Sequence, residues 1–222
     1  MRRVAMDCIV RYAVRPMRLE DVRQVEQIDR ECFPTQWPTL SFGRQLLTNS
    51  LSHYLVVHEP SHERPETSDA APACAEHRLK ERLRHFFEPQ KALQGAPTQR
   101  VIGMVGFWVM AGEAHISTIA VRQAHRRQGL GELLLLSAIE LAQTLDTQVI
   151  TLEVRASNTA AQRLYEKYGF YRTGIRRGYY SDREDAVIMT TEPITTASFH
   201  RHFQCLKQAH VHTWGPVERQ LT

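Results

Sequence analysis

The residues that indicate chemistry most clearly lie in the middle of the chain, at 119–131. Ile119-Ala120-Val121 is typical of the end of an apolar strand, and Arg126-Arg127-Gln128-Gly129-Leu130-Gly131 leads from it into a long apolar helix. Glycine lets the backbone approach a ligand closely, and the first amides of a helix have no partner within the helix. Together with the positive end of the helix dipole, these amides predict a site for an anion such as a pyrophosphate.

The residues of this loop also allow a role without any ligand, because a glycine-containing turn between a strand and a helix is common. A dinucleotide-binding fingerprint needs a third glycine where this chain has Leu134, and a Walker phosphate loop needs a Gly-Lys-Ser/Thr sequence that is absent. The loop therefore matches neither of these two nucleotide-binding motifs.

A carboxylate on one predicted strand and a phenol on the helix after it form a second candidate pair. Glu153 lies on a strand predicted at 149–154, and Tyr165 lies on the next helix, which Asn158 can cap. Carboxylates and phenols serve as proton acceptors and donors in acid–base catalysis. A solvent-facing strand glutamate and a core tyrosine on the apolar face of its helix are the plainer interpretations.

The elements that must position these residues follow from the spacing of apolar residues. Alternating or continuous apolar runs predict strands at 10–15, 53–58, 101–110, 115–121, 149–154, 170–175 and 186–190. Helical spacing predicts helices at 22–32, 40–51 and 130–145, and a fourth that runs from Asn158 to its end at Gly169. The sequence therefore predicts an α+β protein with a mixed central β-sheet flanked by helices.

Composition divides the chain into a domain, an insertion and a tail. Residues 60–100 hold five of the ten prolines, and Leu79, Leu83, Phe86 and Phe87 are spaced as on one face of a short helix. A surface loop is the simpler interpretation of this segment. We therefore predict one domain at 8–194, a loop insertion at 60–100 before the central strand, and a C-terminal extension at 195–222 without a clear period.

The overall composition is that of a globular protein, with 42% hydrophobic and 23% charged residues. The formal net charge of +4 is too small to indicate nucleic-acid binding, and no direct nucleic-acid contact is expected. No run of eighteen apolar residues exists, and the first residues do not match a secretory signal, so we expect no membrane association. Four separated cysteines, Cys8, Cys32, Cys74 and Cys205, suit free thiols in a cytoplasmic location.

The tail contains a group of residues that can be drawn as a metal site. The group consists of His200, His202, Cys205, His210 and His212. Imidazole and thiolate are good zinc ligands, but structural zinc sites use tighter and more regular spacings. We expect a solvated or packed tail and no metal.

The chain resembles the Gcn5-related N-acetyltransferase (GNAT) superfamily, which binds acetyl-coenzyme A. The resemblance begins with the Arg/Gln-x-x-Gly-x-Gly loop after Ile119-Ala120-Val121. It continues in Leu-Glu-Val-Arg-Ala-Ser-Asn at 152–158 and Leu-Tyr-Glu-Lys-Tyr-Gly-Phe at 164–170, and it covers about residues 113–190. Within the superfamily, 152–158 and 164–170 are most similar to members that acetylate the N-terminal alanine of a small-subunit ribosomal protein, and 176–180 with 183–189 also resemble members that acetylate N-terminal amines.

The resemblance implies a role for each matched position. Backbone groups of Ile119, Ala120 and Val121 would hold the acetyl and pantetheine portions of acetyl-coenzyme A. Arg127, Gln128, Gly129, Leu130, Gly131 and Glu132 would surround the pyrophosphate, and Asn158 would contact the cofactor further along. Glu132 departs from the pattern, because a basic side chain is frequent there, and its charge should weaken phosphate binding unless it turns outward.

The same resemblance implies that Glu153 removes a proton from the amine, directly or through water, and that Tyr165 protonates the departing thiolate. Tyr179 and Tyr180 would line the peptide entrance, although ordinary strand tyrosines explain them nearly as well. An α-amine has a pKa of about 7.7–8.0 and a lysine amine about 10.4, so the α-amine is the easier substrate for a carboxylate base. No cysteine or serine matches a nucleophile position, so we expect direct attack, with the oxyanion held by a strand amide near Val121.

The expected function is therefore acetyl transfer from acetyl-coenzyme A to the N-terminal amine of a protein. Alternatives within the enzyme class are other N-termini, lysine side chains and small amines. Outside it, a non-catalytic acyl-coenzyme A binding module remains an alternative, although such a module has no need of Glu153 and Tyr165.

Overall fold

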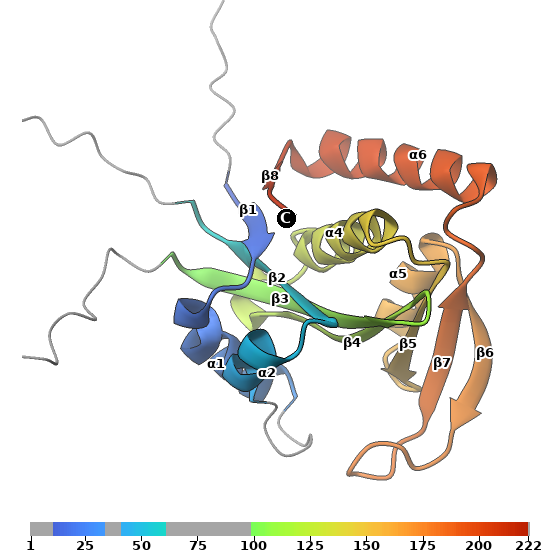
Figure 1. Cartoon of the computed structure of the whole chain (residues 1–222), viewed down its shortest axis with the longest axis horizontal. Helices are drawn as coiled ribbons and strands as arrows, with labels where there is room; N and C mark the ends of the chain where they lie inside the picture. The colour runs from blue at the N-terminus through green and yellow to red at the C-terminus, as the bar shows by residue number, and fades with distance from the viewer. Residues whose placement is uncertain (1–10, 34–40, 61–98, 222) are drawn as a thin grey trace, which may run out of the picture. The chain divides into compact units, whose positions relative to one another are not determined.

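The computed structural model describes residues 11–33, 41–60 and 99–221. Their strands form one eight-stranded sheet in the order β6-β7-β5-β4-β3-β2-β1-β8 (Figure 1). The strands are β1 (Ala13–Pro16), β2 (Ser52–His58), β3 (Val101–Met110), β4 (Glu113–Val121), β5 (Val149–Arg155), β6 (Phe170–Arg176), β7 (Ala186–Thr191) and β8 (Glu218–Arg219). The helices are α1 (Val22–Cys32), α2 (Phe42–Thr48), α4 (Leu130–Thr144), α5 (Thr159–Lys167) and α6 (Ala197–Trp214), with short 3-10 turns η1 (Leu19–Asp21) and η2 (Gln123–His125).

The sheet is mixed, which confirms the predicted α+β class. The β4–β5 and β1–β8 pairs are parallel and the other neighbouring pairs are antiparallel. Helices cover both of its faces, with α4 and α6 on one side and α1 and α2 on the other (Figure 1). The predicted helix at 40–51 is shorter than expected, since α2 spans only Phe42–Thr48.

Alternating residues of the central strands supply the two hydrophobic layers. In β2, Leu55 and Val57 pack with α4 and α6, whereas Tyr54 and Val56 pack with α1 and α2. Because successive strand side chains point to opposite faces, a strand covered on both faces must be apolar throughout. The continuous apolar run of β3, buried from Val101 to Phe107, has the same cause.

The parallel β4–β5 ladder is short, and its end creates the main opening in the sheet. The ladder runs from Glu113 opposite Val149 to Ile116 opposite Leu152. At that point β4 carries an extra residue, Ser117, where its register against β3 shifts. Such a bulge bends a strand and increases its local twist. β4 continues to Val121 and β5 to Arg155, so the ends of both strands border a gap in the pairing.

The C-terminal segment forms the eighteen-residue helix α6, which corrects the expectation of a tail without a period. Thr196 caps this helix by accepting a hydrogen bond from the Phe199 amide, 3.2 Å away. Phe199, Phe203 and Leu206 pack against the layer that contains α4. Their spacing is helical, but His210 takes the next position on the same face and is buried as well. A buried imidazole therefore interrupts the apolar pattern and hides the helical period.

The predicted insertion separates two strands that pair directly with each other. β2 and β3 are antiparallel neighbours, and the Glu59 amide donates to the Arg100 carbonyl oxygen at 3.1 Å. The interior of the insertion, with its predicted short helix, lies outside the described residues, as do Val10, Cys8 and Cys74. Within the described residues, Cys32 and Cys205 have free thiols, and no helix has the length and apolar character needed to cross a membrane.

The packing of α6 can be tested by truncating a buried side chain. Phe203 is 1% exposed, so Phe203→Ala should lower the free energy of unfolding by about 3–5 kcal/mol through lost burial and a new cavity. Val211, on the same helix, is 40% exposed, and Val211→Ala should change that free energy by less than about 1 kcal/mol. Urea unfolding of both variants measures the difference; equal values would contradict the assignment of α6 to the core.

Candidate active site

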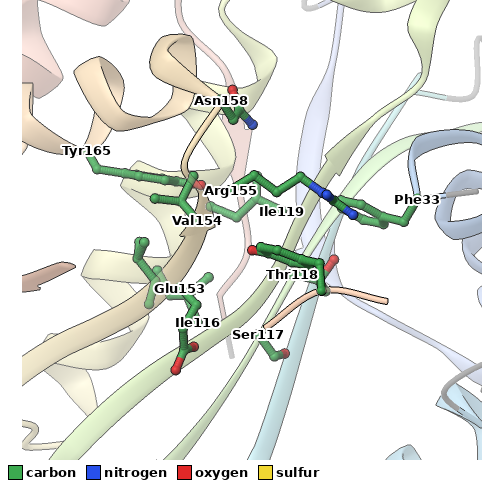
Figure 2. Close-up of a pocket in the computed structure, with 12 residues that line it drawn as sticks. Phe33, Ile116, Ser117, Thr118, Ile119, Glu153, Val154, Arg155, Asn158 and Tyr165 are labelled. Carbon is green, nitrogen blue, oxygen red and sulfur yellow. The ribbon is translucent and has the colours of Figure 1, made fainter. Parts of the chain in front are cut away.

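The gap between β4 and β5 opens into a pocket that contains five residues singled out in the sequence (Figure 2). These five are Ile119 from β4, Glu153 from β5, Asn158 at the N-cap of α5, Tyr165 from α5 itself, and Tyr180 from the β6–β7 connection. The other lining residues are Phe33, Ile116, Ser117, Thr118, Leu152, Val154 and Arg155. Asn158 also caps α5, as predicted, by accepting a hydrogen bond from the Ala161 amide.

Glu153 is a buried carboxylate held between the imidazole of His115 and the guanidinium of Arg176. Its side chain is 7% exposed, and its oxygens lie 2.9 Å from Nε2 of His115 and 3.2 Å from the guanidinium of Arg176. Burial by itself raises the pKa of the Glu153 carboxyl. The hydrogen bond and charge of His115, together with the charge of Arg176, outweigh burial and hold that pKa below its ordinary value. Glu153 is therefore ionised at neutral pH and able to accept a proton.

His115 is a site residue that the sequence patterns did not single out. Its ring stacks on Trp108, with centroids 4.9 Å apart, and its Nδ1 lies 3.1 Å from Oγ1 of Thr151. The parallel ladder brings His115 and Thr151 opposite each other, and Glu153 is two residues further along β5 on the same face. The only signal in the sequence was a histidine at the start of a predicted strand, because the pairing of β4 with β5 is a tertiary property.

Tyr165 projects from α5 into the pocket, with its ring near that of Phe170 at a centroid distance of 5.8 Å (Figure 2). Burial, and to a smaller degree Tyr180, raise the pKa of Tyr165 well above its ordinary value. The phenol therefore stays protonated throughout the neutral range. Proton donation from this phenol to a thiolate therefore costs more free energy than donation from an ordinary phenol.

Of the two tyrosines in the β6–β7 connection, Tyr180 lines the pocket and Tyr179 packs against it. Tyr180 is buried and its ring lies under the guanidinium of Arg155 at 4.1 Å, while Tyr179 packs edge-on against Tyr180 at 5.2 Å. Burial raises the pKa of Tyr180 to about 12, although Arg155 lowers it in part. Arg155 in turn bonds Glu184 at 2.6 Å and Asp182 at 2.8 Å, which fixes the connection against β5.

The predicted phosphate loop contains two residues with left-handed backbone conformations. Arg127 and Gly129 adopt left-handed conformations, with φ of 62° and 74°, and Gly129 is the N-cap of α4. The Gln128 side chain accepts a hydrogen bond from the Tyr12 hydroxyl at 3.0 Å. A Cβ at Gly131 would meet no described atom within 4 Å, so the first turn of α4 faces open space at this position. The helix thus presents an accessible amino end.

Helix α6 supports this loop from outside the region of resemblance. A Cβ at Gly129 would lie 2.6 Å from Nε1 of Trp214, so the indole packs directly on the glycine. Nε2 of His210 lies 3.2 Å from the Gly129 carbonyl oxygen, and Nε2 of His202 lies 2.9 Å from the Lys167 carbonyl oxygen. Two of the tail histidines therefore bond backbone oxygens. In the part of the chain that the structure describes, no group of three or more histidine, cysteine, aspartate or glutamate residues could hold a metal ion.

Glu132, which departs from the resemblance, is neutralised by groups at the end of α5. Its Oε1 lies 2.6 Å from Nζ of Lys167 and 2.7 Å from the Tyr168 hydroxyl. Burial raises the pKa of Glu132, but the bonds from Lys167 and Tyr168 outweigh it, so the net pKa is lowered. The carboxylate thus has a fixed cationic partner, which reduces its repulsion of an anion at the start of α4.

The chain is similar to known acetyltransferases over most of its length. It matches the model of the acetyltransferase (GNAT) family over residues 22–170. A protein of Bacillus subtilis (strain 168), provisionally named ribosomal protein bS18-alanine N-acetyltransferase, is 35% identical over 178 residues, or 80% of this chain and 93% of that protein.

Solved structures of similar fold agree with this match. The ribosomal-protein-S18-alanine N-acetyltransferase of Escherichia coli superposes with a TM-score of 0.60 at 25% identity, covering 84% of this chain and 96% of that chain. Arabidopsis thaliana NAA60 in complex with acetyl-CoA superposes with a TM-score of 0.58 at 17% identity, covering 81% and 97% of the two chains. The NAA60 likeness shows the fold alone.

The pairing of Glu132 should make stability depend on pH. The pKa of Glu132 is lower in the folded state than in the unfolded state, where it is about 4.3. Ionised Glu132 therefore contributes fully to the free energy of unfolding above the unfolded-state pKa, and this contribution is lost as pH falls through the folded-state pKa. Glu132→Gln should therefore lower the free energy of unfolding at pH 7 by about 1 kcal/mol, and the difference should shrink below about pH 4.

Urea unfolding at several pH values measures this difference. Glu166→Gln on α5 is the matched control, because Glu166 is 46% exposed and lies 3.5 Å from Arg172, itself an exposed side chain. A Glu132→Gln effect that is independent of pH, or no larger than that of the control, would show that the lowered pKa does not contribute to folding.

Proposed function

Because the chain belongs to the acetyltransferase (GNAT) family, we propose that it transfers the acetyl group of acetyl-coenzyme A to the N-terminal α-amine of a protein. The observation that carries this proposal is the presence of Glu153 and Tyr165 on the walls of one pocket, between the split strands β4 and β5. An ionised carboxylate can serve as the base, and a protonated phenol as the acid, in the acetylation of an amine.

The described residues fit acetyl-coenzyme A, which supplies a thioester already activated for attack. The start of α4, which faces open space at Gly131, would hold the pyrophosphate through the backbone amides of 129–132, with Arg127 beside them. The β4 residues Ile119, Ala120 and Val121, beyond the end of the β4–β5 ladder, would hold the pantetheine and acetyl portions. Oγ1 of Thr118 is buried and has no hydrogen-bond partner among the described residues, which suits a pocket whose polar contacts come from a ligand.

The lowered pKa of Glu153 favours an α-amine over a lysine side chain. A weak base removes a proton most easily from an acid of similar pKa, and α-amines at about 7.7–8.0 are closer to a carboxylate than lysine amines at about 10.4. Moreover, a large fraction of α-amines is already neutral near pH 7.5. For these molecules, Glu153 only has to remove the proton from the ammonium that forms as the amine attacks the thioester.

Tyr165, on α5, would complete the reaction. Its hydroxyl would donate a proton to the departing coenzyme A thiolate and recover one from solvent before the next turnover. Because burial disfavours the phenolate, we expect donation to accompany cleavage of the carbon–sulfur bond and to leave no lasting phenolate. A β4 amide near Val121 would hold the oxyanion.

The acceptor that we propose is the N-terminal alanine of a small-subunit ribosomal protein. Support comes from the activity named for the Bacillus subtilis and Escherichia coli proteins, whose full lengths the chain nearly covers. Tyr180, which lines the pocket, and Tyr179, which packs against it, would border the entering peptide. Asn158, which lines the pocket and caps α5, would contact coenzyme A.

The proposed activity can be tested by thiol release from acetyl-coenzyme A with a panel of acceptors. Short peptides would begin with Ala, Ser, Met or an acetyl-blocked residue, and an internal-lysine peptide and spermidine would be assayed beside them. We expect release with the free Ala peptide and none with the blocked one. Turnover confined to lysine or spermidine would overturn the proposed substrate, and no turnover with any acceptor, a folded ribosomal protein included, would favour a non-catalytic binding module.

The proposed catalytic roles predict the effect of two conservative substitutions. Glu153→Gln and Tyr165→Phe should each lower kcat by about 10²-fold, because each removes one proton transfer but retains the shape of the side chain. Binding of coenzyme A and the midpoint of thermal unfolding serve as controls. Unchanged turnover in both variants, with binding intact, would remove both assignments.

A further inference from the structure

Helix α6 carries a stripe of side chains that connects the core to the start of α4. Residues three or four apart lie on one face of a helix, and this stripe consists of Phe199, Phe203, Leu206, His210 and Trp214. The first three pack in the core layer that contains α4, and the last two contact Gly129 in the phosphate loop. The helix lies outside residues 22–170, over which the chain matches the acetyltransferase family.

The two side chains at the end of the stripe hold Gly129 from different directions. A Cβ at Gly129 would lie 2.6 Å from Nε1 and 2.7 Å from Cδ1 of Trp214, so the indole occupies the place of a side chain there. The Gly129 carbonyl oxygen accepts from the Leu133 amide at 2.9 Å within α4, and it faces Nε2 of His210 at 3.2 Å. A carbonyl oxygen can only accept, so Nε2 of His210 carries a proton and donates it.

His210 is suited to this contact because it is buried. The residue is 5% exposed, and burial lowers the pKa of its imidazole, although the bond to Gly129 and the charge of Glu132 act in the opposite direction. A neutral imidazole has a single N–H group, and the Gly129 oxygen receives it. A buried donor without a partner is unfavourable, so the ring and the carbonyl group hold each other in place.

The last turn of α6 is fixed by contacts on both sides of Trp214 in the sequence. Before it, Lys207 forms an ion pair with Glu140 of α4. After it, Arg219 of β8 contacts the second carboxylate oxygen of Glu140, and β8 pairs with β1 at the edge of the sheet. The indole therefore sits on an anchored segment and can restrain the glycine that it touches.

The phosphate loop benefits from such a restraint because its turn is unfavourable to form. Arg127 and Gly129 both have left-handed backbone conformations, which are rare for arginine and which restrict the otherwise wide freedom of glycine. The amides of 129–132 can bind a pyrophosphate together only while this turn is formed. A loop that is already ordered before binding avoids the entropic cost of ordering it, so affinity for the ligand is higher.

We propose that His210 and Trp214 are positioning residues that keep the phosphate loop in the conformation that binds the pyrophosphate of acetyl-coenzyme A. The inference rests on the proposed function, in which this loop holds the pyrophosphate. Both residues act through Gly129 and need not touch the cofactor. Helix α6 would therefore raise the affinity for the acetyl donor and leave the acceptor amine and the proton transfer to Glu153 unaffected.

The proposal can be tested at His210, where the donated hydrogen bond can be removed and restored. His210→Leu lacks a donor and should raise KM for acetyl-coenzyme A and the dissociation constant of coenzyme A by about 3- to 10-fold, the range expected for one hydrogen bond. Both kcat and KM for the Ala peptide should stay unchanged. His210→Gln, whose side-chain amide can donate, should recover most of the affinity. Trp214→Ala releases the other side of Gly129 and should raise the same two constants.

His212→Leu is the matched control, because His212 is exposed on the same helix and receives the same substitution. S-acetylpantetheine is an acetyl donor without a pyrophosphate, so its kcat/KM should be the same in His210→Leu and in the unmodified protein. Unfolding midpoints verify that every variant is folded at the assay temperature.

Two results would overturn the inference and leave the proposed function standing. One is an affinity of His210→Leu for coenzyme A equal to that of His212→Leu. The other is an equal loss of kcat/KM with acetyl-coenzyme A and S-acetylpantetheine, which would place the effect outside the phosphate loop. An unmodified protein that binds no coenzyme A would instead overturn the proposed function, and the inference with it.

Discussion

The arrangement of the site depends on the early end of the parallel β4–β5 ladder. After the pair formed by Ile116 and Leu152, β4 and β5 no longer pair with each other, and the extra residue Ser117 bends β4 at that point. Unpaired strand edges inside a protein need other partners for their amides and carbonyls. The pocket lies where these edges separate, so one irregularity in the sheet provides both the space and the free polar groups that a ligand needs.

The paired part of the same ladder has a different consequence. By setting β4 and β5 side by side, it brings His115 of one strand against Glu153 of the other. The carboxylate is buried, which alone would favour its neutral form, but His115 and Arg176 keep it ionised. The same neighbours that keep Glu153 charged also weaken it as a base, which agrees with the proposed α-amine acceptor.

The C-terminal helix α6 contributes to the phosphate loop from far along the sequence. Trp214 packs on Gly129 and His210 bonds its carbonyl oxygen, while Phe203 anchors the helix in the main core. A left-handed N-cap such as Gly129 is held in place by its surroundings, and here α6 provides part of them. The extension is therefore part of the structure that shapes the proposed cofactor site.

The sequence by itself determined the elements whose apolar period is uninterrupted. The runs in β3, α4 and β5, the cap at Asn158 and the glycines of the loop were all readable, because each depends on neighbours a few residues away. The period of α6 was missed because the buried His210 occupies a position where apolar residues are expected. Local patterns predict buried faces well only when every buried position is apolar.

Tertiary structure alone decided which polar side chains meet. The contacts of His115 with Thr151 and Glu153, and of Glu132 with Lys167, join residues that lie on different elements. The sequence pointed to Glu153 through its resemblance to a known family, but it held no sign of the imidazole beside it. A contact across a sheet depends on strand order and register, and both are set by the packing of the whole sheet, beyond the reach of any local pattern.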